Sequence, residues 1–451
     1  MKTHDGASAV YEQAIDRLVR FHPDVLTITD TLTSEYPQAP LGWALAAYLS
    51  LTSTDADDLA GAGAARDTLA SLKLGDVDLG HLAAINAWLA GDWQGAARTL
   101  EAMTQRWPTD ILPLMIGHQL DFFLGDATSL RDRPIRSLRE FPANHQHVGF
   151  VRGMTAFGLE ESGHYDEALD AALAAVEANA DDVWAIHAAV HCYEMRGRVD
   201  VGVDFLGSGK ARWKTDNFFT VHNWWHLALY QLELGNVDEA LAIYDRSIHP
   251  AEATGVPIEL LDATALLWRI WLDDRDTGGR FSSLSDARTR KVTSGPWYVF
   301  NDTHAAMAFA GAGRLADVRA LIERHERWLE SATGSNAYMT GEIGLPVCRS
   351  VLAWAEGRHQ DVVEFLVPVR RTLQRFGGSH AQRDAWQRLL LESALRSGQF
   401  ELARALSAER LGMRERSPYN WTQRARSLHG LGDGVAASEA EDRAKATGLW
   451  A

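Results

Sequence analysis

The chain has only two cysteines, Cys192 and Cys348, among its 451 residues. Two thiols cannot form a disulfide framework, and both lie in apolar segments, so we expect both to be buried and reduced. This pattern favours a cytoplasmic protein. Nucleophilic catalysis by Cys192, which is close in sequence to His191 and Glu194, is the less favoured alternative.

Runs of basic residues are absent as well. The formal net charge is −16, and Arg370-Arg371 is only a pair. Nucleic acids and anionic membranes bind through basic patches, so we expect neither as a partner. No apolar segment approaches the roughly 18 residues of a membrane helix, and the first residues lack the pattern of a signal peptide.

Several catalytic signatures are missing. The chain has no Gly-x-Ser-x-Gly nucleophile elbow, and the segment Gly377-Gly378-Ser379-His380 has neither the lysine nor the preceding strand of a phosphate-binding loop. No histidine pair carries the glutamate that follows the first histidine in zinc proteases. These absences exclude the commonest serine hydrolase, nucleotide-binding and zinc protease motifs.

Glycine followed by polar residues and a new helix start recurs along the chain. The spacing between the first five of these glycines is 34, 38, 34 and 38 residues, at Gly91, Gly125, Gly163, Gly197 and Gly235, with later ones at Gly313, Gly357, Gly398 and Gly432. A period near 34 residues is typical of tetratricopeptide repeats. We therefore predict an all-α protein, a right-handed superhelix of helical hairpins that encloses a central pocket.

The repeat spacing divides the chain into two parts. Residues 1–75 are predicted to form an N-terminal helical cap, and residues 76–451 a single continuous repeat superhelix. Two stretches, 273–297 and 333–346, interrupt the repeat with glycine and polar residues. Because insertions in repeat proteins form loops on one face, we expect these two to border the binding face.

Histidines concentrate on two predicted helices. Residues four and seven apart lie about 40° and 20° apart around a helix, so His187, His191 and Glu194 share one face. His222 and His226 share a face in the same way. So many polar residues inside repeat helices need a reason, because an unpaired buried polar group costs about 1–3 kcal/mol.

Three explanations fit this set. The histidines can bridge helices through structural hydrogen bonds, or they can line a pocket for an organic molecule together with Trp184, Trp224 and Trp225. Alternatively they hold a metal ion, for which His187, His191 and Glu194 are the candidate ligands to Zn²⁺, Mn²⁺ or Fe²⁺. The sequence requires no cofactor, and a divalent metal is one alternative.

Several blocks together resemble the tetratricopeptide repeat protein 38 family. They span roughly residues 80 to 400 and comprise 183–195, 222–230, Ile243-Tyr244-Asp245, Leu261-Asp262, 300–304, Gly344-Leu345-Pro346 and 377–384. The resemblance implies a superhelix of helical hairpins, with no general activity assigned. Two blocks depart from the family pattern: His118 is followed by Gln119 instead of an acid, and Glu342 stands where an aspartate is usual.

The site residues follow from these patterns and from the resemblance. The candidate catalytic residues are His187, His191, Glu194, His226, Asp302 and His304. The candidate ligand-binding residues are His118, Trp184, His222, Trp225, Tyr244, Asp262, Glu342, Arg383 and Asp384. Asp302 can instead be a helix-start charge, and Arg383 and Asp384 can form a structural ion pair instead of anchoring a ligand carboxylate.

Two classes of function remain. The first is a pocket protein for a small organic molecule, an enzyme such as a hydrolase or lyase that uses acid/base or metal-assisted chemistry. The second is a repeat scaffold that binds a partner peptide on its concave face, which is a common use of this architecture. The histidines favour the pocket, and the oligomeric state cannot be read from the sequence.

Overall fold

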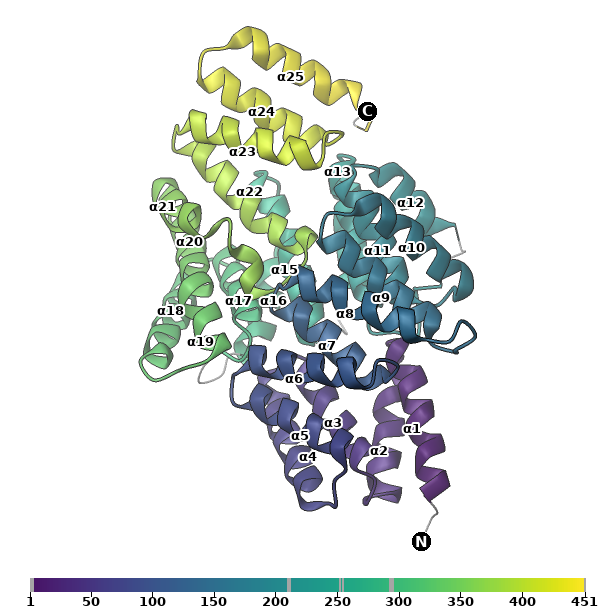
Figure 1. Ribbon diagram of the computed structural model, residues 1–451. Coiled ribbons are helices and arrows are strands. Elements are labelled where there is room, and N and C mark those ends of the chain that lie inside the picture. The colour runs from purple at the N-terminus through teal and green to yellow at the C-terminus, as the bar shows by residue number, and fades with distance from the viewer. Residues whose placement is uncertain (1–3, 209–211, 251–252, 254, 292–295, 450–451) are drawn as a thin grey trace.

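The structure is a computed structural model that describes residues 4–208, 212–250, 253, 255–291 and 296–449. Helices α1 to α25 follow one another, and the described residues contain no strand (Figure 1). The helices of the first part are α1 (His4–Val19), α2 (Asp24–Glu35), α3 (Pro40–Thr52), α4 (Leu59–Ser71), α5 (Asp76–Leu89), α6 (Trp93–Arg106), α7 (Ile111–Phe123), α8 (Ala127–Glu140), α9 (Val148–Glu161), α10 (Tyr165–Ala178), α11 (Val183–Met195) and α12 (Val199–Gly207).

The second part continues in the same way. Its helices are α13 (Thr220–Glu233), α14 (Val237–Ile243), α15 (Pro257–Leu272), α16 (Arg280–Lys291), α17 (Val299–Gly311), α18 (Leu315–Leu329), α19 (Ser335–Met339), α20 (Leu345–Ala355), α21 (His359–Val369), α22 (His380–Arg396), α23 (Phe400–Met413), α24 (Pro418–Gly430) and α25 (Gly434–Ala446). Short 3₁₀ or π segments lie at Ala56–Asp58, Tyr244–Ile248, Thr340–Gly344 and Leu373–Phe376.

Consecutive helices pack as hairpins, and the predicted glycines make the turns. Pairs such as α3 with α4, α9 with α10 and α24 with α25 are in extensive contact. All nine predicted turn glycines have a positive φ, from 62° at Gly197 to 83° at Gly163. A left-handed residue of this kind ends a helix and is easiest for glycine. The prediction of an all-α, tetratricopeptide-like superhelix of hairpins is therefore confirmed.

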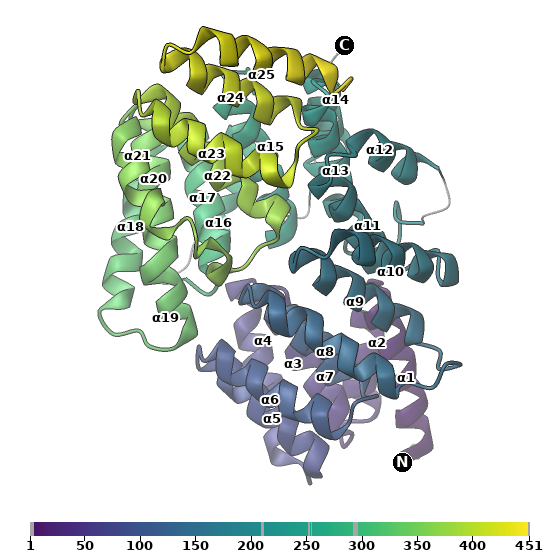
Figure 2. The ribbon, with the colours of Figure 1, turned by 45° about the horizontal axis from the view of Figure 1, so that its top comes forward.

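The superhelix is folded back on itself. The N-terminal helices touch the middle of the chain, where Phe21 stacks on Trp184 with ring centroids 5.3 Å apart and Arg20 pairs with Asp181 at 2.6 Å. They also touch the later helices, where Asn301 Nδ2 donates to the carbonyl of Thr54 at 3.0 Å. Figures 1 and 2 show α9–α13 on one side and α17–α21 on the other, with α15 and α22 between them. The segments around α11 are thereby enclosed on several sides.

Both predicted interruptions contain helices, which corrects the expectation of loops. About half of 273–297 forms α16, and residues 292–295 lie outside the described residues. The segment 333–346 forms α19 and a π segment that runs directly into α20. Asn336 explains the second case, because its amide donates to the Pro296 carbonyl at 2.8 Å and its own carbonyl accepts from Thr340 Oγ1 at 2.8 Å. The first of these hydrogen bonds therefore holds α19 against the segment that contains Pro296.

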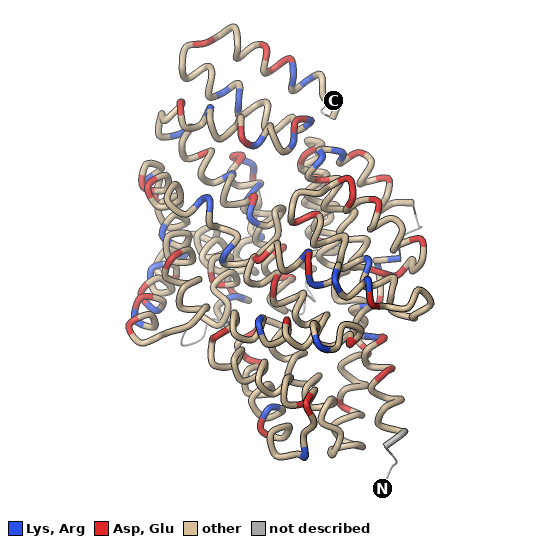
Figure 3. The backbone as a smooth tube through the Cα atoms, viewed as in Figure 1, with Lys and Arg blue, Asp and Glu red and all other residues tan. Residues whose placement is uncertain are grey.

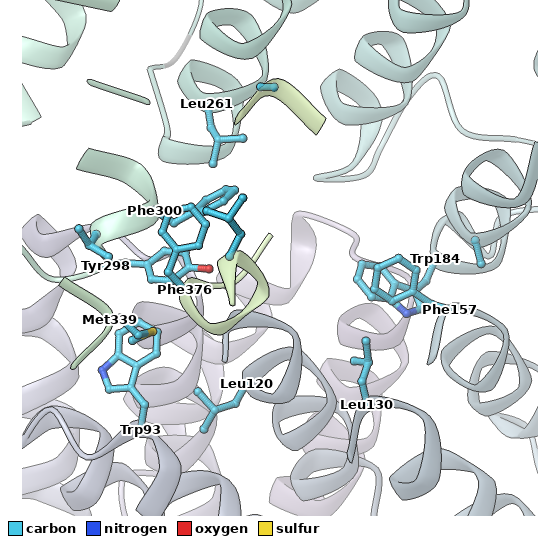
Figure 4. Close-up of a cluster of buried hydrophobic side chains, with 14 of the residues drawn as sticks. Trp93, Leu120, Leu130, Phe157, Trp184, Leu261, Tyr298, Phe300, Met339 and Phe376 are labelled. Atoms are coloured by element: carbon cyan, nitrogen blue, oxygen red, sulfur yellow. The ribbon is translucent and has the colours of Figure 1, made fainter. Parts of the chain in front are cut away.

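Aromatic side chains fill much of the interior. In Figure 4, Tyr298, Phe300 and Phe376 lie together on one side, and Phe157 faces Trp184 on the other. The Phe157 and Trp184 rings are 4.6 Å apart between centroids, in an edge-on arrangement. This second group adjoins the predicted histidine helices.

Both cysteines are buried and free, as predicted. Burial raises the pKa of the Cys192 thiol and of the Cys348 thiol. A buried thiol with a raised pKa carries little thiolate, so Cys192 is poorly suited to act as a nucleophile.

Charge is spread over the outer helices. Figure 3 shows acidic and basic residues interleaved along most of the outer helices. Arg370 pairs with Glu409 at 2.6 Å and Arg371 lies 3.9 Å from the same carboxylate. Across the residues that the structure covers, no helix combines the length and apolar character that crossing a bilayer requires.

Candidate metal centre

Helices α11 and α13 carry the central histidines. Asp182 caps the N-terminus of α11, because its carboxylate accepts a hydrogen bond from the backbone N–H of Ala185 at 3.0 Å. Every residue of α11 is buried. Helix α13 buries its own histidine face against α11 and α15. A helix that is enclosed all round must place polar residues where they find partners, because water cannot reach them.

The four histidines of these helices meet in one cluster. One ring nitrogen each from His187, His191, His222 and His226 lies within 4.8 Å of those from the other three. The ring centroids of His187 and His191 are 4.3 Å apart, and those of His191 and His226 are 4.5 Å apart. None of the four is more than 3% exposed. The predicted helix faces therefore converge on one point.

In three of these rings, Nδ1 lies next to a carboxylate. His222 Nδ1 lies 2.8 Å from Asp262 Oδ2 on α15, and His226 Nδ1 lies 3.3 Å from Glu194 Oε2 on α11. His191 Nδ1 lies 3.4 Å from Glu160 Oε2 on α9. Metal-bound histidines commonly donate one ring N–H to a carboxylate, which fixes the ring and leaves the other nitrogen free to bind the metal.

The opposite ring nitrogens face one another. His187 Nε2 and His222 Nε2 are 3.0 Å apart. His191 Nε2 and His226 Nε2 are buried and have no hydrogen-bond partner among the described residues. In a tetrahedral zinc site with Zn–N of about 2.0–2.1 Å, the ligand nitrogens are about 3.3 Å apart. The His187–His222 separation is slightly shorter than this spacing, and all four ligand nitrogens lie within 4.8 Å of one another.

Burial favours the neutral form of three of these imidazoles. It lowers the pKa of His191 to about 4, and it lowers the pKa of His187 and His226 well below the ordinary value, helped by the neighbouring histidines. Metal ions bind the neutral ring, so these three histidines need not lose a proton before binding. Burial also raises the pKa of Asp262 and, together with Glu161, that of Glu160.

Glu194 stands behind the cluster instead of among its ligand atoms. Its carboxylate contacts His226 and is held on the other side by Arg414, with an N–O distance of 3.1 Å. Of the predicted set, His187 and His191 lie among the four converging rings, and Glu194 lies beside His226. Helical spacing put Glu194 on the correct face, and its carboxylate is held between His226 and Arg414.

Aromatic residues predicted for the pocket surround the cluster. Trp184 Nε1 donates to His118 Nε2 at 3.0 Å and its ring lies 5.2 Å from that of His187. Trp225 stacks on His222, with centroids 5.2 Å apart and planes at 21°. His118, Trp184 and Trp225 therefore help to shield the histidine cluster from water.

Asp302 and His304 have other partners. Asp302 lies in the first turn of α17, with its carboxylate 3.6 Å from His325 Nε2. His304 Nδ1 donates to the Phe300 carbonyl at 2.8 Å, and its ring packs against Trp386. Neither residue has a contact with His191 or His226 within the described part of the chain.

The remaining predicted residues are dispersed. Tyr244 is buried in the core between α13, α14 and α15, and Glu342 is exposed. Arg383 contacts Glu161 at 3.1 Å, whereas Asp384 contacts Arg388 and Arg410, each at 2.8 Å. Arg383 and Asp384 thus form separate ion pairs rather than the mutual pair favoured from sequence.

Glu160 and Glu161, at the end of α9, were missed by the sequence analysis. Both are buried, and Glu161 Oε1 lies 4.0 Å from His191 Nδ1. Although burial alone would raise it, His380, Arg383 and His191 lower the pKa of Glu161 to about 2. Two adjacent acidic residues ending a mainly apolar helix, whose only other charged residue is Arg152, were the available signal in the sequence.

A pocket opens beside this carboxylate pair. It has a volume of about 180 Å³ and lies between the α7–α8 hairpin, the end of α9 and α22. Glu161, His380 and Arg383 form its polar wall, and Phe122 and Leu130 its apolar wall. A molecule in this pocket would be separated from His191 by the Glu161 carboxylate.

Comparisons with known proteins show a distant structural likeness. No family model matches the chain. The human IFIT1 dimer with PPP-AAAA is 11% identical, with a TM-score of 0.38 over 98% of this chain and 95% of that one. Yeast Tom70 is 12% identical, with a TM-score of 0.33 over 98% and 92% of the two chains. The P58(IPK) TPR domain is 12% identical, with a TM-score of 0.23 over 82% and 93%.

Proposed function

We propose that His187, His191, His222 and His226 bind one divalent transition-metal ion. The observation that carries this proposal is the convergence of four buried ring nitrogens, with carboxylates behind three of the rings. Left without a metal, several of these nitrogens would be buried and unsatisfied, at a cost of about 1–3 kcal/mol each. A cation at the centre would satisfy them together.

The ligand set indicates the kind of metal. Four neutral imidazoles suit Zn²⁺, Cu²⁺, Ni²⁺ or Fe²⁺, whereas Mg²⁺ and Ca²⁺ prefer oxygen ligands. The buried carboxylates of Asp262, Glu194 and Glu160 supply negative charge close to the ion. The structural alternative, a lattice of hydrogen bonds among histidines, accounts for His187 with His222 but leaves His191 Nε2 and His226 Nε2 unexplained.

We further propose that the protein is an enzyme, a hydrolase or lyase for a small organic molecule. The pocket of about 180 Å³ reaches Glu161, whose carboxylate neighbours His191. That arrangement would place the ionised Glu161 carboxylate beside a molecule in the pocket, where it would accept a hydrogen bond and orient that molecule. Membership of the tetratricopeptide repeat protein 38 family and a cytoplasmic location are parts of the same proposal, and both rest on the sequence.

The peptide-binding scaffold has less support. A scaffold needs an open concave face, but α22 packs against α11 and α15 between α9–α13 and α17–α21. Binding of a partner peptide elsewhere on the surface stays a prediction from the repeat architecture.

Metal analysis of protein purified without a histidine tag tests the first proposal. We expect at least one equivalent of transition metal per chain in the wild type and loss of the ion from the four-histidine site in His226→Gln. His81→Gln is the matched control, since His81 is also fully buried but contacts Tyr48 at 3.1 Å instead of the cluster. Equal metal content in His226→Gln and His81→Gln, with both folded, would contradict the proposal.

A further inference from the structure

His191 is unusual among the four histidines because both of its nitrogens lack a hydrogen bond to any residue in the described ranges. One of them, Nδ1, faces the carboxylates of Glu160 and Glu161 at 3.4 and 4.0 Å. Because Nδ1 is directed to these carboxylates, Nε2 on the opposite side of the ring is left for the histidine cluster. The ring therefore stands between two groups of ligand atoms.

Glu160 shows the same lack of partners. Its side chain is fully buried, and both carboxylate oxygens are without a hydrogen-bond donor within the described part of the chain. A buried carboxyl group with no donor is costly unless a cation or a proton neutralises it. Glu161 differs, since the His380 backbone N–H donates to it at 2.8 Å and Arg383 lies 3.1 Å away.

We propose that Glu160, Glu161 and His191 form a second divalent-cation site, joined to the four-histidine site through the imidazole of His191. Ligand atoms of these three residues lie within 4.8 Å of one another, and all three residues are buried. Two carboxylate oxygens and one imidazole nitrogen are a common ligand set for Zn²⁺, Mn²⁺ and Fe²⁺. The two negative charges would balance the charge of the ion.

The bridging role of His191 rests on the four-histidine metal site proposed above. Binding of metal at both nitrogens of His191 replaces the ring N–H bond by a second metal–nitrogen bond. The proton released, with any proton carried by Glu160, passes to solvent. Metal binding should therefore release protons and tighten as the pH rises.

The two sites would differ in access. Four protein ligands close the first site, as in structural zinc centres, whereas three ligands leave the second with a position open. Glu161 also lines the pocket of about 180 Å³, so the open position would face it. Water or a substrate oxygen could bind there, and the second ion would then be the one that contacts substrate.

Copper loading of the tag-free apoprotein tests the second site. We expect two Cu²⁺ per chain by elemental analysis after gel filtration, and a paramagnetic resonance signal well below that of two independent ions because the imidazole couples them. Glu160→Gln should hold one Cu²⁺ per chain, with the full signal of an isolated ion. Glu392→Gln is the control, since Glu392 is also buried but pairs with Arg396 and Arg426 on the far side of α22.

Each outcome decides between the two proposals. One Cu²⁺ per chain in the wild type, or two in Glu160→Gln, would overturn the second site and leave the first intact. No bound Cu²⁺ in any folded protein would overturn both. If Glu160→Gln does not fold, the copper content and signal of the wild type alone decide the matter.

Discussion

At His222, one hydrogen bond decides which ring nitrogen faces the other histidines. Its Nδ1 is hydrogen-bonded to the Asp262 carboxylate at 2.8 Å, so Nε2 points to His187. Sequence analysis singled out both residues, His222 from its helical spacing and Asp262 from the family resemblance. It could not pair them, because they lie 40 positions apart on different helices.

Asp262→Asn should therefore weaken metal binding without abolishing it. An asparagine keeps a hydrogen-bond acceptor but removes the charge that raises the basicity of His222, and such changes typically cost 10–100-fold in affinity, or about 1.4–2.7 kcal/mol. Competition with a chromogenic zinc chelator measures the dissociation constant. Asp245→Asn, on the surface beside Arg280, is the control and should bind as the wild type does. An unchanged affinity in Asp262→Asn would remove Asp262 from the proposed centre.

At the scale of the element, turn glycines place the helices that form the pocket. Gly125 ends α7 with φ of 63°, and a Cβ added there would overlap the backbone carbonyl of Gln374. Both Gly125 and Gln374 line the pocket. Gly163 ends α9 with φ of 83°, but a Cβ added there would meet no atom within 4 Å. The sequence identified both as turn glycines and could not distinguish them.

Gly125→Ala should destabilise the protein more than Gly163→Ala. Both place alanine in a left-handed conformation, at a cost of about 1–2 kcal/mol. Only the first also forces the α7–α8 turn away from Gln374. Thermal unfolding followed by circular dichroism should give a clearly lower midpoint for Gly125→Ala. Equal midpoints would mean that the contact with Gln374 does not restrain the turn.

At the scale of the whole molecule, enclosed histidines make stability depend on pH. Burial lowers the pKa of His81 and of His118 to about 3, from an unfolded value of 6.5. As the pH falls below 6.5, the unfolded chain takes up protons that the folded protein does not. Each such histidine therefore removes about 1.4 kcal/mol of stability per pH unit between its unfolded and folded pKa.

His81→Gln should flatten this pH dependence. We expect the loss of stability between pH 6 and pH 4 to be smaller than in the wild type by about 1.4 kcal/mol per pH unit, because one proton is no longer taken up on unfolding. Urea unfolding at a series of pH values measures it, with His429→Gln, an exposed histidine on α24, as the control. A slope identical to that of the wild type would show that His81 is protonated in the folded state.

The sequence by itself determined the repeat and the histidine faces. Glycine spacing fixed the turns, and helical periodicity put His187 with His191 and His222 with His226, because both features depend on neighbours within a few residues. The reliance on local patterns also explains why 333–346 was expected to be a loop: it contains Asn336, whose side-chain amide donates to the carbonyl of Pro296, a residue 40 positions away.

Only the tertiary structure determined which residues the histidine faces of α11 and α13 contact. Packing between neighbouring helices brings the end of α9 to α11 and helix α15 to α13, so that Glu160 and Asp262 become partners of the histidines. The same kind of packing pairs Asp302 with His325, whereas Arg383 reaches Glu161 across 222 residues of chain. These pairings depend on contacts between different helices, which no local pattern encodes, and on burial, which makes each unpaired polar atom costly.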